Sequence, residues 1–358
     1  MPPSSGQAPR RENQTMKVGL VGYQGSGKSA VFELLTGSAP DLSKSQTGQA
    51  GIAIVPDERF DRLVEHYQPK KVVPARIEMF DTPGLDRDRP ENNAQRLGVI
   101  REAHLLVQVI GEFTGHSVID DITSFGDDLT LADLQVVSNR IDRLKKDIQK
   151  PRPDREELQR ELEAIEPIAK MLEDGQSLLD VEFTEAQEKV TRSFSLLTRK
   201  RRLIVINTTD ADIDESLLSA VTDLDLAVLS APLGLELEVQ ALSDEDRAEF
   251  AAEMGLGDPS RERLLRLIFD ATDQITFYTS GEKEVHAWLL KRGRTVVEAA
   301  HEIHSDLARG FVRAEIWSSE DLLRLGSERE VKAAGLNHVE GKEYIVQDGD
   351  EIFIRSGV

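Results

Sequence analysis

The glycine-rich segment from Gly22 to Ser29 combines residue types and a spacing that suit the binding of phosphate groups. It reads Gly-Tyr-Gln-Gly-Ser-Gly-Lys-Ser and fits the pattern G-x-x-x-x-G-K-S/T. Glycines let backbone N–H groups turn toward phosphate oxygens, and the N-terminus of a following helix adds partial positive charge. We expect Lys28 to reach the β- and γ-phosphates and the Ser29 hydroxyl to bind Mg²⁺. The residues expected to contact a nucleotide here are Gly22, Gly25, Ser26, Gly27, Lys28, Ser29 and Ala30.

A second segment, Asp81-Thr-Pro-Gly84, follows a predicted strand and suits the γ-phosphate side of such a site. The Asp81 carboxylate is expected to hold Mg²⁺ through water, and the Gly84 N–H to meet the γ-phosphate. Lys28 and Gly84 are therefore the candidate catalytic residues. Each motif alone has a plain alternative, a chance glycine-rich turn for the first and a proline–glycine turn for the second. Together they predict a nucleoside triphosphatase.

Thr47 lies between the two motifs in a polar, glycine-rich loop. It is placed to complete the Mg²⁺ shell, which gives Ser29, Thr47 and Asp81 as the expected metal-binding residues. Ser45 competes with Thr47 for this role, and loop residues of this kind also serve as plain linkers.

Leu85 follows Gly84 at the position where Ras-type enzymes carry the glutamine that orients the attacking water. Without that side chain, hydrolysis is expected to be slow unless a partner or another loop supplies the group. Arg87 and Arg89 are nearby, and we interpret them as solvated loop charges.

The segment Asn207-Thr-Thr-Asp210 follows another predicted strand, where guanine-specific proteins have Asn-Lys-x-Asp. Asp210 could accept hydrogen bonds from guanine N1 and N2, because a carboxylate only accepts. Thr208 replaces the lysine that packs on the nucleotide. The alternative is an Asn/Asp cap after a strand, so the choice between ATP and GTP stays open.

These motifs need a scaffold in which strands alternate with helices. Apolar runs near residues 16–21, 75–80, 105–110, 202–207 and 226–230 predict a parallel sheet with helices on both faces. Between Leu131 and Asp174, apolar residues recur at spacings of three and four on either side of a Lys-Pro-Arg-Pro-Asp segment. This pattern predicts an antiparallel helical hairpin inserted into the α/β domain.

Short strands dominate from Asp273 onward and predict a small α+β module. The expected organisation is a disordered tail at 1–15, a P-loop domain at 16–126 and 201–272, a coiled-coil helical insertion at 127–200 and the final module at 273–358.

Composition narrows the functional classes. The chain has no cysteine, so a disulfide framework, a thiolate metal site and a cysteine nucleophile are excluded. A formal charge of −21 disfavours general nucleic-acid binding. The apolar runs fall well short of the ~20 residues that span a bilayer. The first fifteen residues are polar and carry no apolar stretch suited to secretion. We expect a cytoplasmic protein with no membrane partner.

A local basic patch is still compatible with this charge balance. The predicted hairpin tip carries Arg140, Arg143, Lys145, Lys146, Lys150, Arg152 and Arg155. Solvated coiled-coil charges are one interpretation, and contact with ribosomal RNA is the other.

Several strings elsewhere give the chain a specific resemblance to a known family. They include Ile54-Val-Pro-Asp-Glu-Arg-Phe-Asp-Arg-Leu63, Ser230-Ala231 followed by Glu236, Ala299-Ala-His-Glu-Ile-His-Ser-Asp306 and Glu340-Gly-Lys-Glu-Tyr-Ile-Val-Gln-Asp-Gly-Asp350. From about Met16 to its end, the chain resembles the YchF/Obg-like ATPase family of Obg-related P-loop proteins.

The resemblance implies a P-loop G domain, a coiled-coil insertion and a C-terminal TGS domain with a β-grasp fold. It also implies a ribosomal partner, and it adds Ser230 and Ala231 to the nucleotide-binding residues. Family members carry a hydrophobic residue at the Leu85 position and read adenine with Asn-x-x-Glu, whereas this chain has Asp210 in the fourth place.

The chain departs from the family pattern in two further places. Residues 86–93 replace a Gly-rich loop, and Tyr-Gln-Gly-Ser in the P-loop replaces Leu-Pro-Asn-Val. The chain thus resembles a divergent paralogue. Two functions fit the sequence: a slow ATP- or GTP-hydrolysing switch that works with the ribosome, and a nucleotide-sensing binding protein without useful turnover.

Overall fold

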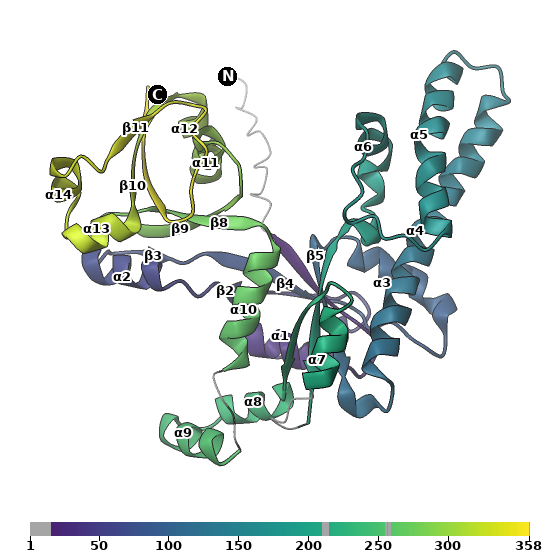
Figure 1. Ribbon diagram of the computed structural model, residues 1–358, viewed down its shortest axis with the longest axis horizontal. Coiled ribbons are helices and arrows are strands. Elements are labelled where there is room, and N and C mark those ends of the chain that lie inside the picture. Colours follow the sequence, from purple (N-terminus) through teal and green to yellow (C-terminus); the bar gives the residue numbers. More distant parts are fainter. Residues whose placement is uncertain (1–15, 210–214, 255, 257–258, 358) are drawn as a thin grey trace, which may run out of the picture. The chain divides into compact units, whose positions relative to one another are not determined.

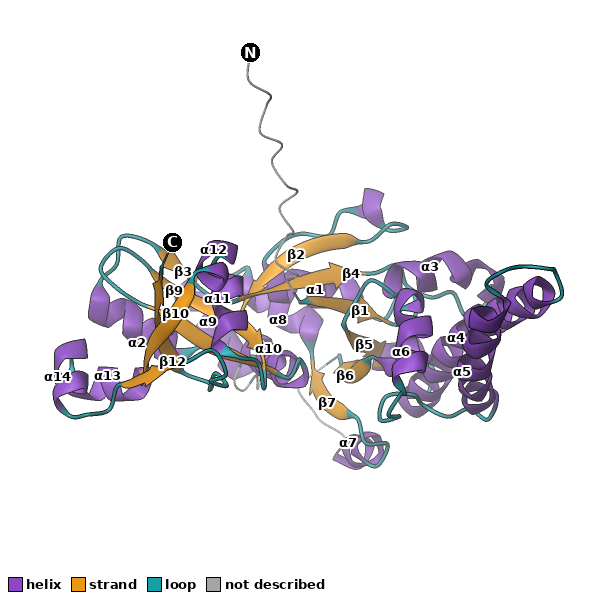
Figure 2. Ribbon diagram, turned by 90° about the horizontal axis from the view of Figure 1, so that it is seen from above, coloured by secondary structure: helices purple, strands orange, loops and turns teal. Residues whose placement is uncertain are grey.

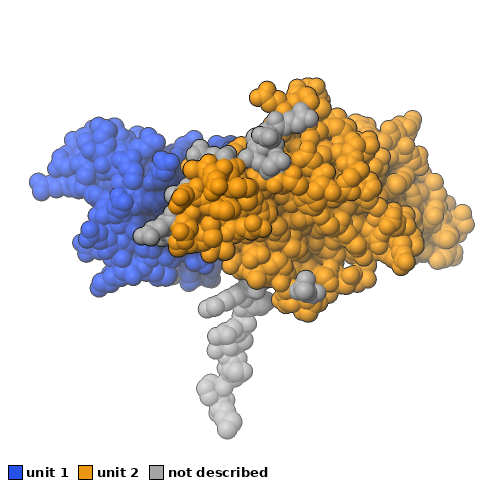
Figure 3. All heavy atoms as spheres, turned by 90° about the horizontal axis from the view of Figure 1, so that it is seen from below, with its two compact units in different colours: residues 1–16, 52–77, 269–358 blue, residues 17–51, 78–268 orange. Residues whose placement is uncertain are grey.

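The computed structural model describes residues 16–209, 215–254, 256 and 259–357. The tail predicted at 1–15 and the predicted base-reading residue Asp210 lie outside the described residues. The chain divides into two compact units (Figure 3). Of the described residues, unit 1 contains 16, 52–77 and 269–357, and unit 2 contains Lys17–Gly51 and Glu78–Ile268.

Unit 2 is built on a largely parallel sheet with the strand order β2-β4-β1-β5-β6-β7 (Figure 2). Strand β1 pairs in parallel with both β4 and β5, and β6 pairs in parallel with both β5 and β7. All residues of β5 are buried, which explains its nearly unbroken apolar sequence. The strands are β1 (Lys17–Val21), β2 (Gln49–Ile54), β4 (Arg76–Asp81), β5 (Leu105–Gly111), β6 (Arg201–Asn207) and β7 (Ala227–Ala231). The predicted α/β fold with a parallel-type sheet is confirmed.

Helices pack on this sheet: α1 on β1, α4 on β5 and α7 on β7. Because the strands are parallel, the segments that follow β1, β4 and β6 emerge at one edge of the sheet. The helices of this part of the chain are α1 (Lys28–Thr36), α3 (Asn93–Ile100), α4 (Val118–Ile148), α5 (Arg155–Glu173), α6 (Glu185–Thr191), α7 (Glu215–Thr222), α8 (Leu233–Gln240), α9 (Asp244–Glu253) and α10 (Ser260–Ala271).

Helices α4 and α5 form the predicted antiparallel hairpin and lie side by side (Figure 1). Val137, Ile141 and Leu144 of α4 pack against Ile165 and other apolar residues of α5. The insertion was expected to begin at residue 127, but α4 is continuous from Val118, because its first turns pack on the sheet and its later turns form the hairpin. No helix in the described part of the chain is long and apolar enough to cross a membrane.

A buried carboxylate fixes the base of this hairpin. Asp133 of α4 is fully buried, and it accepts hydrogen bonds from Arg101 Nη1 at 2.6 Å and from the backbone N and Oγ1 of Thr198, both at 2.8 Å. A buried charge with this many partners is well compensated. Asp133 thereby joins α4 to the end of α3 and to the 3₁₀ turn η5 (Leu197–Arg199) that precedes β6.

Unit 1 contains a second sheet, with the order β11-β10-β12-β8-β9-β3. Its core gathers Phe277, Leu290, Val296 and Ile316 around α11. The strands are β3 (Val72–Val73), β8 (Gln274–Thr279), β9 (Val285–Lys291), β10 (Phe311–Ser318), β11 (His338–Glu340) and β12 (Asp350–Ser356), and the helices are α2 (Glu58–Tyr67), α11 (Val296–Ile303), α12 (Ser305–Arg309), α13 (Ser319–Leu325) and α14 (Glu328–Ala333).

The division into units differs from the expected domain boundaries at residues 52–77, which were assigned to the P-loop domain. Strand β3 in this segment pairs with β9. The Tyr278 hydroxyl donates to Asp57, and Arg59 forms an ion pair with Asp348 at 2.8 Å. Contacts between residues so distant in the sequence leave no local pattern, so this grouping was not predicted.

Candidate functional site

The glycine-rich loop joins β1 to α1, and two of its glycines are required by close packing. Gly22 has φ 133° and Gly27, the N-cap of α1, has φ 94°. A Cβ atom on Gly22 would lie 2.4 Å from the Val109 carbonyl oxygen, and one on Gly27 would lie 2.2 Å from Asn207 Nδ2. Only glycine accepts both the dihedral angles and the contacts.

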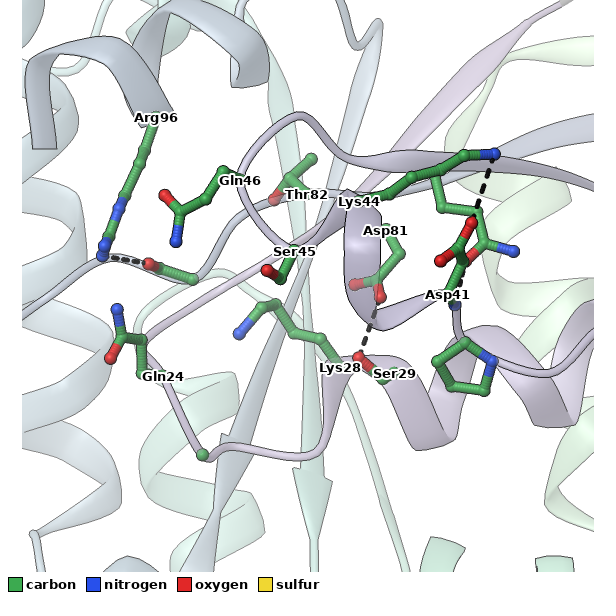
Figure 4. Close-up of a pocket in the computed structure, with 14 residues that line it drawn as sticks. Gln24, Lys28, Ser29, Asp41, Lys44, Ser45, Gln46, Asp81, Thr82 and Arg96 are labelled. Carbon is green, nitrogen blue, oxygen red and sulfur yellow. Dashed lines mark hydrogen bonds and ion pairs between the residues drawn. The ribbon is translucent and has the colours of Figure 1, made fainter.

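A cavity of about 360 Å³ opens beside this loop (Figure 4). It carries three cationic and two anionic side chains, a balance that suits a polyanion accompanied by a metal ion. Its lining residues are Gln24, Gly25, Lys28, Ser29, Pro40, Asp41, Lys44, Ser45, Gln46, Gln49, Asp81, Thr82, Gly84 and Arg96.

Lys28 lies almost entirely below the surface, and its Nζ donates a hydrogen bond to the Tyr23 carbonyl oxygen at 2.7 Å. Burial lowers the pKa of Lys28 to about 8; the Asp81 carboxylate opposes this shift and the Arg96 charge adds to it. A phosphate group beside the ammonium would favour its charged form. An anion bound in the cavity would therefore stabilise the charged form of Lys28.

Asp81 and Ser29 meet at the end of β4, where the Ser29 hydroxyl donates to Asp81 Oδ2 at 2.8 Å (Figure 4). The other oxygen, Oδ1, is buried and has no hydrogen-bond partner among the described residues. Burial raises the pKa of Asp81. An unsatisfied carboxylate oxygen beside a hydroxyl is a donor set that fits Mg²⁺, which binds oxygen ligands.

The segment after Asp81 is held against the glycine-rich loop by backbone hydrogen bonds. Leu85 N donates to the Gly22 carbonyl oxygen and Gln24 N donates to the Leu85 carbonyl oxygen, both at 3.0 Å. Gly84 is brought so close that a Cβ atom there would lie 2.7 Å from Lys28 Nζ. The structure therefore places the two predicted catalytic residues, Lys28 and Gly84, side by side.

The Leu85 side chain does not face the cavity. It is fully buried in an apolar cluster with Val21, Tyr23, Leu97 and Phe125. The side chain at this position thus belongs to the core between the loop and α4. The sequence indicated that a water-orienting group is missing here, and the structure adds that the position is occupied for packing.

Arg87 differs from its prediction as a solvated loop charge. Its guanidinium pairs with the buried carboxylate of Asp121 on α4 and lies 3.7 Å from the centre of the Tyr23 ring. The Tyr23 hydroxyl also reaches α4, donating to Asp128 at 2.9 Å. The prediction is wrong for Arg87 because buried Asp121 requires a counter-charge, and it is confirmed for the exposed Arg89.

The structure separates the two candidates for the third metal-binding residue. Both residues are exposed, but Ser45 lines the cavity and Thr47 is absent from the lining residues. The Thr47 N–H donates to the Lys44 carbonyl oxygen at 3.0 Å. In this conformation Ser45 is the better placed of the two.

Asn207, at the end of β6, connects the glycine-rich loop with the loop after β7. Its Oδ1 accepts from Leu233 N at 3.2 Å, and its Nδ2 makes a long contact of 3.5 Å with the Ser26 carbonyl oxygen. Ser230 and Ala231 are buried beside it, and Ala231 pairs with Asn207. Ala30 lies half-buried on α1. The predicted residues of the base side thus come together, with Asp210 outside the described residues.

Several residues of this cavity were not predicted from the sequence, and Gln24 and Arg96 are the two that contact each other beside Gly84. Gln24 was treated only as a variable position within the loop motif. Arg96 lies in a helix whose local pattern indicates only an amphipathic element. The sequence offered one signal: Arg96 is a cationic residue that follows the Asp81 segment closely and belongs to no predicted motif.

Known protein families match an N-terminal and a C-terminal part of the chain. The model of a 50S ribosome-binding GTPase family matches residues 17–140, and YchF-GTPase_C, described as a protein of unknown function, matches residues 274–356. The ribosome-binding ATPase YchF of Bacillus subtilis is 31% identical over 96% of this chain and 100% of its own length. Obg-like ATPase 1 of Oryza sativa subsp. japonica is 30% identical over 97% of this chain and 94% of its own length.

Two solved structures share the fold. The Schizosaccharomyces pombe YchF GTPase superposes with a TM-score of 0.78 at 24% identity, covering 95% of this chain and 98% of that one. A GTP-binding protein from Pyrococcus horikoshii OT3 gives a TM-score of 0.59 at 18% identity, covering 95% of this chain and 100% of that one.

The cavity geometry predicts different effects for two matched hydroxyl substitutions. Because Ser45 lines the cavity and Thr47 does not, we expect Ser45→Ala to weaken Mg²⁺-dependent triphosphate binding about tenfold, as the loss of a metal-site contact does. Thr47→Ala is expected to leave the affinity nearly unchanged. Calorimetric titration with a non-hydrolysable triphosphate, with and without Mg²⁺, measures both. A loss confined to Thr47→Ala would contradict the assignment.

Proposed function

Because the chain belongs to the YchF/Obg-like ATPase family, we propose that it hydrolyses ATP or GTP slowly with Mg²⁺, as a conformational switch that works with the ribosome. One observation carries the nucleotide part of this proposal. Lys28, Ser29, Asp81 and Gly84, from two segments far apart in the sequence, meet in one cavity. This is the arrangement by which P-loop proteins bind a triphosphate.

Ser29 and Asp81 would hold the metal ion, with Ser45 as the further ligand, because Ser45 lines the cavity and Thr47 does not. When bound, Mg²⁺ neutralises charge on the phosphate oxygens. Lys28 binds the β- and γ-phosphates as a cation. The Gly84 N–H, which has no hydrogen-bond acceptor among the described residues, is available for the γ-phosphate.

Slow turnover is supported by the burial of Leu85. The position that would orient the attacking water is packed into the core, so its side chain cannot take part in hydrolysis. A slow reaction suits a switch, because the triphosphate state then lasts long enough to be recognised. The same burial favours the second candidate, a nucleotide-sensing binding protein without useful turnover.

The ribosomal part rests on what the relatives are named and on the hairpin surface. Four of the seven tip cations are offset by the chain's own carboxylates: Arg140 by Glu161, Lys145 by Glu166, Lys150 by Asp147 and Arg152 by Asp154. Arg143, Lys146 and Arg155 are exposed and have no ion pair with a residue that the structure describes. These three cations are the proposed contacts for ribosomal RNA.

Lys28→Ala tests whether hydrolysis comes from this cavity. We expect single-turnover phosphate release from ATP or GTP to fall at least about a hundredfold, because the residue supplies charge to the transferring phosphate. Lys170→Ala, an exposed lysine on α5, is the control and should behave as the unaltered protein. Unchanged phosphate release by Lys28→Ala would show that the hydrolysis does not take place in this cavity. No release by the unaltered protein, with triphosphate binding intact, would favour the binding-protein alternative.

Charge reversal at the hairpin tip tests the ribosomal contact. We expect Arg143→Glu, Lys146→Glu and Arg155→Glu together to reduce ribosome co-sedimentation at least about tenfold and to flatten its salt dependence by roughly one unit of slope per lost phosphate contact. The matched control reverses Lys170, Arg201 and Arg263, which are exposed and lie at the far end of α5, at the start of β6 and on α10. Equal loss in both triple variants would indicate a net-charge effect and would argue against a contact at the tip.

A further inference from the structure

Arg96 lines the cavity, and neither the sequence motifs nor the family resemblance gives it a role. It lies on α3, is half-buried and lines the same cavity as Lys28 (Figure 4). Its Nη1 donates to the Gly84 carbonyl oxygen at 2.6 Å. The Gln24 amide is assigned with its oxygen toward the guanidinium, at 2.6 Å from Nη1 and 3.0 Å from Nη2, because the reverse assignment would oppose two donors. Arg96 is thus fixed between the glycine-rich loop and the segment after Asp81.

The charge of Arg96 is uncompensated within the described part of the chain. No carboxylate there lies within ion-pair distance of it, whereas Arg87 pairs with Asp121 and Arg101 with Asp133. A half-buried guanidinium without an anion, placed beside a second cation, is unfavourable unless an anion arrives. Its planar set of donors matches the oxygens of a phosphate group.

We propose that Arg96 contacts the γ-phosphate and stabilises the charge that develops there during hydrolysis, as an arginine supplied from within the chain. This inference rests on the proposed nucleotide site. Gly84, whose N–H is expected to meet the γ-phosphate, holds Arg96 through its own carbonyl oxygen. The guanidinium has five N–H donors, so donors remain for phosphate oxygens after the bonds to Gly84 and Gln24 are made.

The role of Arg96 in the reaction is electrostatic. The water oxygen forms a bond to the γ-phosphorus while the bond from that phosphorus to the β–γ bridging oxygen breaks. The bridging oxygen leaves with the electron pair on the nucleoside diphosphate. Of the two protons of the water, one stays on the attacking oxygen and the other passes to a γ-phosphate oxygen, so both leave with inorganic phosphate. In this transition state, negative charge is spread over the γ-phosphate oxygens, and an arginine positioned beside them stabilises that charge.

Arg96→Ala, Arg96→Lys and the control Arg89→Ala, an exposed arginine of the neighbouring loop, test the proposal in the full-length chain. We expect Arg96→Ala to slow single-turnover hydrolysis at least about thirtyfold, in keeping with the effect of an arginine on phosphoryl transfer. Arg96→Lys should recover only part of the rate, because it keeps the charge without the planar fork. Arg89→Ala should leave the rate unchanged.

Nucleotide binding separates a γ-phosphate contact from a structural role. Arg96→Ala should bind Mg²⁺ and nucleoside diphosphate as the unaltered protein does, which also shows that it folds. The ratio of its affinities for a non-hydrolysable triphosphate and for the diphosphate should fall about tenfold, which is the effect of losing one charged hydrogen bond. The variant should also fail to bind diphosphate with aluminium fluoride, a mimic of the transferring group.

The outcomes are distinguishable from those that test the proposed function. If the unaltered chain hydrolyses triphosphate and Arg96→Ala matches it in rate and in triphosphate preference, the Arg96 proposal fails and the proposed function stands. If the unaltered chain binds triphosphate without hydrolysis, loss of the preference in Arg96→Ala still supports the contact. If the unaltered chain binds no triphosphate, both proposals fail.

Discussion

The arrangement of the site depends on the attachment of Leu85 to the glycine-rich loop. Two backbone hydrogen bonds join Leu85 to Gly22 and Gln24, and the Leu85 side chain is buried in the core. The preceding residue, Gly84, is thereby set against the Lys28 ammonium, and its carbonyl oxygen becomes the acceptor for Arg96. An apolar residue at this position is therefore part of how the phosphate-facing segment is held in place.

The same attachment extends toward the hairpin. Arg87, two residues after Leu85, covers the Tyr23 ring and pairs with Asp121, while Tyr23 donates to Asp128. Both carboxylates belong to α4, which continues without interruption into the hairpin. Any movement of the segment from Gly84 to Arg87 must either break the buried ion pair or carry the start of α4 with it. Contiguous contacts therefore link the phosphate side of the cavity to the hairpin.

The sequence predicted those features whose signal is local. The P-loop, the strand-terminal Asp81 and the apolar seams of the hairpin follow from spacing and periodicity over a few residues. Arg87 was misjudged, because its partner Asp121 lies on another element and nothing near Arg87 indicates a buried carboxylate. Arg96 was missed because its place at the cavity depends on how α3 packs. The grouping of residues 52–77 with the C-terminal strands depends on contacts more than 200 residues apart in the sequence.

Leu85→Gln tests most directly whether residue 85 acts by packing in the core and takes no part in hydrolysis. The fully buried side chain predicts that the free energy of unfolding falls by about 2 kcal/mol or more, because an amide is placed in an apolar cluster, and that single-turnover hydrolysis does not become faster. Leu85→Met is the control and should be nearly neutral. A Leu85→Gln protein with unchanged stability and hydrolysis about tenfold faster or more, the gain expected of a water-orienting glutamine, would contradict this account.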